Sequence, residues 1–100
     1  MGFTQKLKPL QAKRTIDYIL ERGCVIVTTH CRLDSMPKRH VDMNDVQYVL
    51  KHGQIIQEPE WDSDNENWKY RVEGTDVEGE ELTAIAAIES TSMLIVITVF

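Results

Sequence analysis

Apolar side chains early in the chain recur with the period of an α-helix. Residues 9–22 carry one apolar stripe at the spacing i, i+4, i+7 and i+8, formed by Ala12, Ile16, Ile19 and Leu20. Pro9 suits a first helical turn, Gly23 suits a C-terminal cap, and Arg22 lies near the negative end of the helix dipole. The pattern therefore predicts a helix from Pro9 to Arg22.

A second helical pattern follows Asp42. This residue suits an N-terminal cap, and Asp45, three positions later, provides a shorter form of the capping box. The apolar stripe behind the cap consists of Met43, Val46, Val49 and Leu50. Gly53 ends the pattern. Between the two helices we expect a short helix that Pro37 interrupts.

The other apolar segments have the pattern of β-strands. Residues 24–29 are β-branched almost throughout, and residues 54–57 read as a short strand. Residues 82–88 and 93–100 are nearly continuous apolar runs, which is typical of central strands covered on both faces. The strand expected at residues 68–74 alternates instead, with one face formed by Trp68, Tyr70 and Val72 and the other by Lys69, Arg71 and Glu73.

Two polar segments connect these strands. Residues 58–67 are acidic and predict a mobile loop, and residues 75–81 predict a turn in which Gly79 takes a positive φ. The order of elements indicates an α+β fold, in which N-terminal helices pack on one face of an antiparallel meander. We expect a single domain over residues 1–100, since independent cores usually need about 50 to 200 residues.

The composition, 42% hydrophobic and 27% charged, is that of a soluble globular protein. The longest apolar run is far shorter than the roughly 20 residues that span a bilayer, and the opening segment alternates polar and apolar residues, unlike a signal segment. These features predict a cytoplasmic protein with no membrane association. In that compartment Cys24 and Cys31 are expected to be reduced, buried thiols.

The net charge of −5 conceals an asymmetry between the two halves of the chain. Residues 1–52 carry nine Lys and Arg against five acids, a net of +4, whereas residues 53–100 carry two against eleven, a net of −9. Such a division predicts either one basic and one acidic face or two unrelated solvated surfaces. The overall acidity argues against a protein that coats nucleic acid generally.

The strongest candidate for chemistry is His30 with Arg39 and Arg71. A histidine accepts or donates a proton near neutral pH, and an arginine fork binds phosphate oxygens at two points. RNA cleavage without a metal needs such groups: a base for the 2′-hydroxyl and cations for the phosphate. The alternative is that His30 satisfies backbone groups while the cations stay solvated, and the residues alone leave both open.

Other chemistries have weaker support. His30, Cys31, His40 and His52 lack the spacing of a zinc site, and the acidic loop has Asn67 where a calcium loop needs glycine, so we expect no metal and no cofactor. Cys31 beside His30 is a weak nucleophile candidate, because adjacent strand residues point to opposite sides. Trp61 and Trp68 flank the acidic loop and suit stacking on a base or docking on a partner.

Several motifs in fixed order resemble bacterial domain-of-unknown-function family 4258. They are "TTH", a basic segment ending at Arg39, "VDMNDVQYVLKHGQII", "KYRVEG" and "MLIVITVF", and they cover roughly residues 14–100. Relative to the family pattern, the segment from His30 to Arg39 is one residue longer. Ser35 or Asp34 replaces the arginine that precedes Met36.

This family resembles the RelE/MqsR-type toxin superfamily, small α+β domains of which many cleave RNA without a metal. The resemblance implies His30 as general acid and base, Arg39 and Arg71 as catalytic cations, and RNA contacts from Arg32, Lys69 and Tyr70. It also implies RNA and a cognate antitoxin as partners. The rival hypothesis is a non-catalytic module that binds a protein partner through residues 58–67 and the sheet edge.

Overall fold

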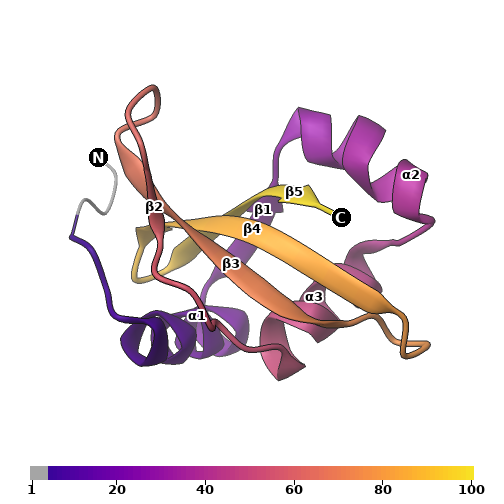
Figure 1. The fold of residues 1–100 in the computed structure, drawn as a ribbon, viewed down its shortest axis with the longest axis horizontal. Coiled ribbons are helices and arrows are strands. Elements are labelled where there is room, and N and C mark those ends of the chain that lie inside the picture. Colours follow the sequence, from indigo (N-terminus) through magenta and orange to yellow (C-terminus); the bar gives the residue numbers. More distant parts are fainter. Residues whose placement is uncertain (1–4) are drawn as a thin grey trace.

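The computed structural model describes residues 5–100, so the expectation about the opening segment falls partly on residues 1–4, outside the described part. Helices and strands follow one another in an α+β arrangement (Figure 1). The elements are α1 (Pro9–Arg22), β1 (Cys24–Val27), η1 (Cys31–Ser35), α2 (Met36–Arg39), α3 (Met43–His52), β2 (Glu60–Asp62), β3 (Asn67–Thr75), β4 (Glu81–Ser90) and β5 (Met93–Val99).

The strands form one mixed sheet in the order β1-β5-β4-β3-β2. Strands β2 to β5 make the predicted antiparallel meander. The prediction of a purely antiparallel sheet is wrong at β1, which pairs in parallel with β5. A parallel pair requires a long crossover between its strands. The helices and the strands β2 to β4 provide that crossover here.

Both long helices form where the sequence predicts them. Helix α1 has the predicted bounds, and α3 begins behind a reciprocal cap: the Asp45 amide donates to Asp42 Oδ1 at 3.1 Å, and the Asp42 amide donates to Asp45 Oδ2 at 3.0 Å. Helix α3 ends beside β3, where a Cβ on Gly74 would stand 2.9 Å from the Gly53 Cα. Two glycines therefore let the helix end approach the strand.

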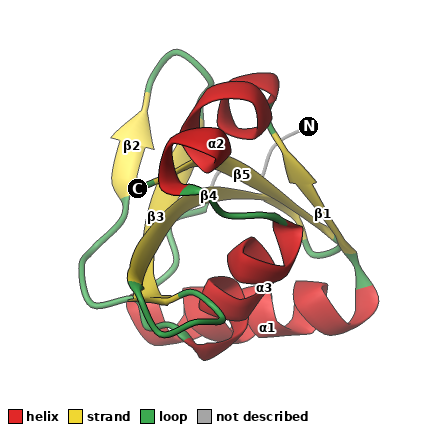
Figure 2. Cartoon of the chain, turned by 90° about the vertical axis from the view of Figure 1, so that its right-hand side faces the viewer, coloured by secondary structure: helices red, strands yellow, loops and turns green. Residues whose placement is uncertain are grey.

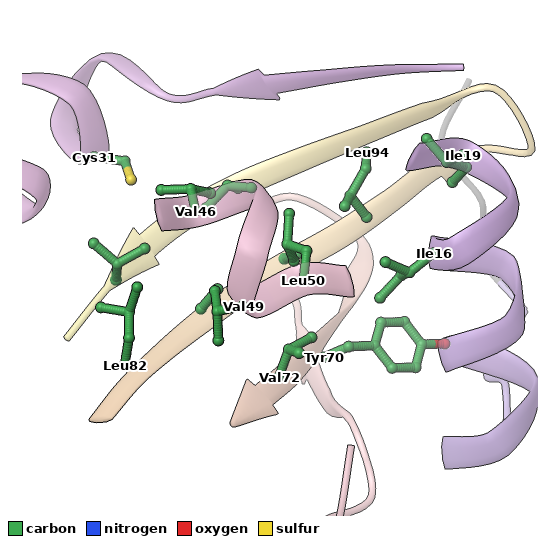
Figure 3. Packing of buried hydrophobic residues seen from close by; sticks show 14 of the residues in the cluster. Ile16, Ile19, Cys31, Val46, Val49, Leu50, Tyr70, Val72, Leu82 and Leu94 are labelled. Carbon is green, nitrogen blue, oxygen red and sulfur yellow. The ribbon is translucent and has the colours of Figure 1, made fainter. Parts of the chain in front are cut away.

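The core lies between one face of the sheet and the helices α1 and α3. Figure 3 shows Val46, Val49 and Leu50 of α3 above the strands, with the Tyr70 ring directed toward α1. Figure 2 shows α1 and α3 on one side of the sheet and α2 on the other. Buried apolar side chains of the helices and strands form a single cluster.

The opposite side of the sheet, which we call the open face, has no long helix of residues 5–100 on it. The strand register aligns Arg71, Ile85 and Thr98 in one row on this face. Ile85 and Ile95 are only partly buried there. Coverage of the central strands on both faces was therefore a wrong prediction. The nearly continuous apolar runs misled this prediction, because β-branched side chains also pack well on a sheet surface that is only half buried.

Two predicted connections differ in the structure. Residues 54–57 do not form a strand, because only Gln54 bridges to Glu73. The segment expected as a mobile loop is instead largely a hairpin, in which β2 pairs with the start of β3. Gly79 has the predicted positive φ, at 89°. Among residues 5–100 no helix is long and apolar enough to cross a membrane.

Candidate functional site

His30 lies in the first turn of a helical segment, beyond the end of β1. Strand β1 stops at Val27, and Thr28 caps the helix: its Oγ1 accepts from the Cys31 amide at 3.1 Å and its carbonyl accepts from the Arg32 amide at 3.0 Å. The predicted strand over residues 24–29 is thus two residues too long. The cap fixes the direction in which His30 leaves the sheet.

This helical segment runs from η1 into α2 without a break, so the predicted interruption at Pro37 is wrong. Residues Cys31–Ser35 form a π-helix, in which the Met36 amide donates to the Cys31 carbonyl. Pro37 follows in the first turn of α2, where its missing N–H is tolerated. A π-turn holds one more residue than an α-turn, so the segment is locally wider than a regular α-helix at Cys31–Ser35.

One side of the segment is anchored and the other faces a hollow. Cys31 and Met36 are buried in the core cluster. The hollow has a volume of about 330 Å³ and lies between the segment and the end of β5. Its lining residues are His30, Asp34, Ser35, Lys38, Arg39, Thr98, Val99 and Phe100.

The lining of the hollow includes two hydroxyl groups, those of Ser35 and Thr98. Ser35 Oγ and Thr98 Oγ1 are hydrogen-bonded at 2.8 Å, and Ser35 is almost fully buried. Ser35 therefore fastens the helix to β5 and contributes no cation to the hollow.

Charged groups also line the hollow. Asp34 Oδ2 lies 3.6 Å from His30 Nε2 and 3.3 Å from Lys38 Nζ, each pair separated by four residues along the segment. Arg39 Nη2 donates to the Glu81 carbonyl at the start of β4. Arg39 thus both lines the hollow and ties α2 to the sheet.

Arg71 reaches the same region from β3. Its guanidinium carbon lies 5.1 Å from the centroid of the Phe100 ring, which is a wall of the hollow. Arg71 Nε is 3.4 Å from Glu73 Oε2 in a geometry that is no hydrogen bond, and this buried atom has no hydrogen-bond partner among the described residues. The structure thus joins His30 and Arg39 in one hollow and places Arg71 against its aromatic wall.

The three residues expected to contact RNA lie in different places. Lys69 is on the open face, where its Nζ is 3.7 Å from Asp62 Oδ2. Arg32 is exposed on η1, outside the hollow. Tyr70 is buried on the helix-covered face, and its hydroxyl accepts from the Leu7 amide at 2.9 Å. Burial raises the pKa of Tyr70, so we leave this residue out of the candidate site.

The other chemistries gain no support from the geometry. Burial raises the pKa of Cys31, which disfavours the thiolate that a nucleophile requires. Cys24 is exposed, in contrast to the buried thiol expected there. Among residues 5–100 no three His, Cys, Asp or Glu side chains gather in a group that could hold a metal ion.

Asp34, Lys38 and Phe100 line the hollow but were not among the predicted catalytic or RNA-contacting residues. The spacing of His30, Asp34 and Lys38 was a usable signal, since residues four apart lie on one helix face. No such signal existed for Phe100. Its contact with Arg71 depends on the registers of β3, β4 and β5.

Comparison with known proteins gives one match. The model of the family described as Domain of unknown function (DUF4258) matches residues 27–100, which begin at the last residue of β1 and include the helical segment with His30 and all later strands. Helix α1 precedes the matched part. No curated protein and no solved structure matches the chain. The match covers well over half of the sequence, and the chain therefore belongs to the DUF4258 family.

Proposed function

We propose that this domain is a RelE-like, toxin-type endonuclease that cleaves single-stranded RNA without a metal, with its reaction centre in the hollow beside His30. One observation carries the proposal. His30, Lys38 and Arg39 line a single hollow at the rim of the open face, and Arg71 packs on that hollow's Phe100 wall. A proton acceptor and several cations therefore converge where a phosphodiester would lie.

The proposed reaction is a transesterification within the RNA. The ribose O2′ bonds to the adjacent phosphorus while the bond from phosphorus to O5′ breaks. Neutral His30 takes the proton from O2′, and the Lys38 ammonium gives a proton to the departing O5′. The products are a 2′,3′-cyclic phosphate and a 5′-hydroxyl. Solvent then restores both side chains to their starting protonation states.

The remaining polar groups suit the phosphate. Arg39 and Arg71 would stabilise the negative charge that grows on the phosphate oxygens, with Lys69 farther along the open face. Asp34 lies within reach of both His30 and Lys38, so it holds their side chains on the same side of the helix. A cognate antitoxin, the partner that a toxin-type activity implies, would act by covering this hollow.

Phe100 favours an unpaired base as the neighbour of the scissile phosphate. Phe100 is 48% exposed, and its ring is backed by the Arg71 guanidinium. A base stacked on an exposed aromatic ring contributes about 1–3 kcal/mol, and only an unpaired base can reach the ring. This is why the substrate is proposed to be single-stranded.

The test uses the full chain and a fluorescent single-stranded oligoribonucleotide, incubated with EDTA. We expect fragments that end in a 2′,3′-cyclic phosphate. His30→Ala should slow cleavage by about 10²–10⁴-fold, the usual contribution of a general base. Arg71→Ala should also slow it, since the cation that faces the phosphate is lost.

Two controls make the test decisive. His52→Gln changes a histidine that packs on Tyr48 at the end of α3, and it should leave the rate unchanged. A substrate with 2′-O-methyl groups should resist cleavage, because it lacks the attacking hydroxyl. Intact RNA with the unaltered protein, or equal rates for His30→Ala and His52→Gln, would contradict the proposal.

A further inference from the structure

The hairpin of β2 and β3 presents an unpaired strand edge. Strand β2 is the last strand of the sheet, and it pairs only with β3. Its outer edge therefore has no strand partner among residues 5–100. Free backbone N–H and C=O groups at such an edge can pair with an added strand.

An exposed aromatic side chain lies on the same strand. Trp61 is 46% exposed, and its ring meets the half-buried Trp68 ring at a centroid distance of 5.1 Å in a T-shaped arrangement. Trp68 belongs to the shell that packs on the core cluster. Trp61 is thus held firmly and still offers apolar surface, which is a typical anchor in protein interfaces.

The negative charge of the hairpin restricts which kinds of partner can pair with the edge of β2. The hairpin and its approach carry Glu58, Glu60, Asp62, Asp64 and Glu66, with no Lys or Arg between residues 58 and 66. Among the described residues, Glu60, Asp64 and Glu66 form no ion pair. Repulsion between like charges disfavours a second copy of this edge and disfavours a nucleic acid.

We infer that the outer edge of β2 binds an extended, lysine- or arginine-rich segment of a partner protein as an additional strand. Backbone hydrogen bonds would hold the segment along Glu60–Asp62. Its cations would meet the carboxylate of Glu60 and compete with Lys6, 3.1 Å from Glu58 Oε1, for the carboxylate of Glu58. An apolar side chain would cover Trp61. This interaction is independent of the proposed RNA cleavage, because it uses a different element of the fold.

A short synthetic peptide of alternating lysine and valine, added to the ¹⁵N-labelled full chain, tests the inference. We expect amide shifts concentrated at residues 60–62 and a blue shift of tryptophan emission that Trp61→Phe removes. The double variant Glu58→Gln and Glu60→Gln should weaken binding by about tenfold at low salt. The matched double variant Glu78→Gln and Glu80→Gln, at the turn between β3 and β4, should bind like the unaltered chain.

Two further peptides separate strand pairing from simple charge attraction. A peptide of alternating glutamate and valine should not bind, which supports charge selection. The lysine–valine peptide with every backbone nitrogen methylated should also fail to bind, because neither of its edges can then donate hydrogen bonds to β2. The inference is overturned if the methylated peptide binds equally well, if shifts appear away from β2, or if no binding occurs. None of these outcomes bears on RNA cleavage.

Discussion

The hollow beside His30 and the β2–β3 hairpin are two parts of the same sheet with opposite character. The segment 30–39 carries Arg32, Lys38 and Arg39 and a single acid, Asp34, whereas residues 58–66 carry five acids and no Lys or Arg. The helical segment is fastened to the core by buried side chains, whereas the hairpin lies at the edge of the sheet. A chain with a net charge of −5 can therefore still concentrate cations at one place, so net charge does not decide what a local surface binds.

Strand β3 begins in the hairpin, reaches Phe100 of the hollow through Arg71, and combines both characters. Lys69 and Arg71 face the open side, and each lies within 4 Å of a carboxylate, that of Asp62 or Glu73. Partly exposed ion pairs contribute only about 0–1 kcal/mol, so a phosphate can displace such a carboxylate at little cost. We therefore expect anion binding to weaken along β3 from Arg71, beside the hollow, to Lys69, beside the hairpin.

The largest expected difference between the two regions is in stability. Met36 is buried under the helical segment, and Met36→Ala should lower the free energy of unfolding by about 2–5 kcal/mol because it leaves a cavity. Trp61→Ala removes a half-exposed ring from the hairpin and should cost about 0.5–1.5 kcal/mol, the value of its aromatic pair. Urea unfolding followed by circular dichroism measures both. Equal losses would show that the hairpin is as firmly integrated as the helical segment.

RNA affinity should change in opposite directions in the two regions. Lys38→Gln removes a cation of the hollow and should weaken binding of a non-cleavable 2′-O-methyl RNA by about threefold to tenfold, with a salt slope smaller by about 0.7. Glu60→Gln removes a repulsive charge and should strengthen binding by about twofold. Fluorescence anisotropy at several salt concentrations gives both values, with Arg14→Gln on α1 as the control. Changes of the same sign in the two variants would refute the charge division.

A smaller effect concerns strained backbone, which both regions contain. His40 ends α2 with φ at 55°, and Glu66 in the hairpin turn has φ at 52°. Side chains disfavour this left-handed conformation, so glycine at either position should stabilise the fold by about 0.5–1 kcal/mol. Thermal unfolding of His40→Gly and Glu66→Gly checks this. Gly79, also at positive φ, offers the control, since Gly79→Ala should destabilise the chain.

Features that depend on neighbouring residues were predictable from the sequence. The bounds of α1 and the reciprocal cap of Asp42 and Asp45 follow from local hydrogen bonding and periodicity, and both are present. The parallel pairing of β1 was not predictable, because it depends on contacts with β5, about seventy residues later. The apolar pair in residues 54–57 indicated a strand, but tertiary packing left it with only one bridge.

In the candidate site, too, the contacts set by neighbouring residues were predictable and those set by distant strands were not. His30 and Arg39 share one hollow because they share one helical segment, so a local pattern was sufficient to connect them. The contact of Arg71 with Phe100 depends on the registers of three strands, which the sequence pattern does not determine. Tyr70 was a different case, since alternation along β3 already placed it on the face opposite Lys69 and Arg71. The family resemblance implied an RNA contact for Tyr70, although the alternation of side chains already indicated that it faces the core.

The smallest expected effect is a local response of the hairpin to acid. Hydrogen bonds from the Asn65 side-chain amide and from the backbone amides of Asn65 and Asp64 lower the pKa of the Asp62 carboxyl below its usual value. The charged form therefore stabilises the folded turn at neutral pH, and this contribution is lost as the pH falls through the lowered pKa. After division by the intrinsic exchange rate at each pH, the amide protection factors of residues 62–66, measured by NMR, should fall below about pH 4. Asp62→Asn should remove this pH dependence, whereas the Ser35–Thr98 hydroxyl contact of the hollow does not titrate in that range. An equal fall in protection factors in both regions would mean that acid loosens the whole fold and that the hairpin does not respond separately.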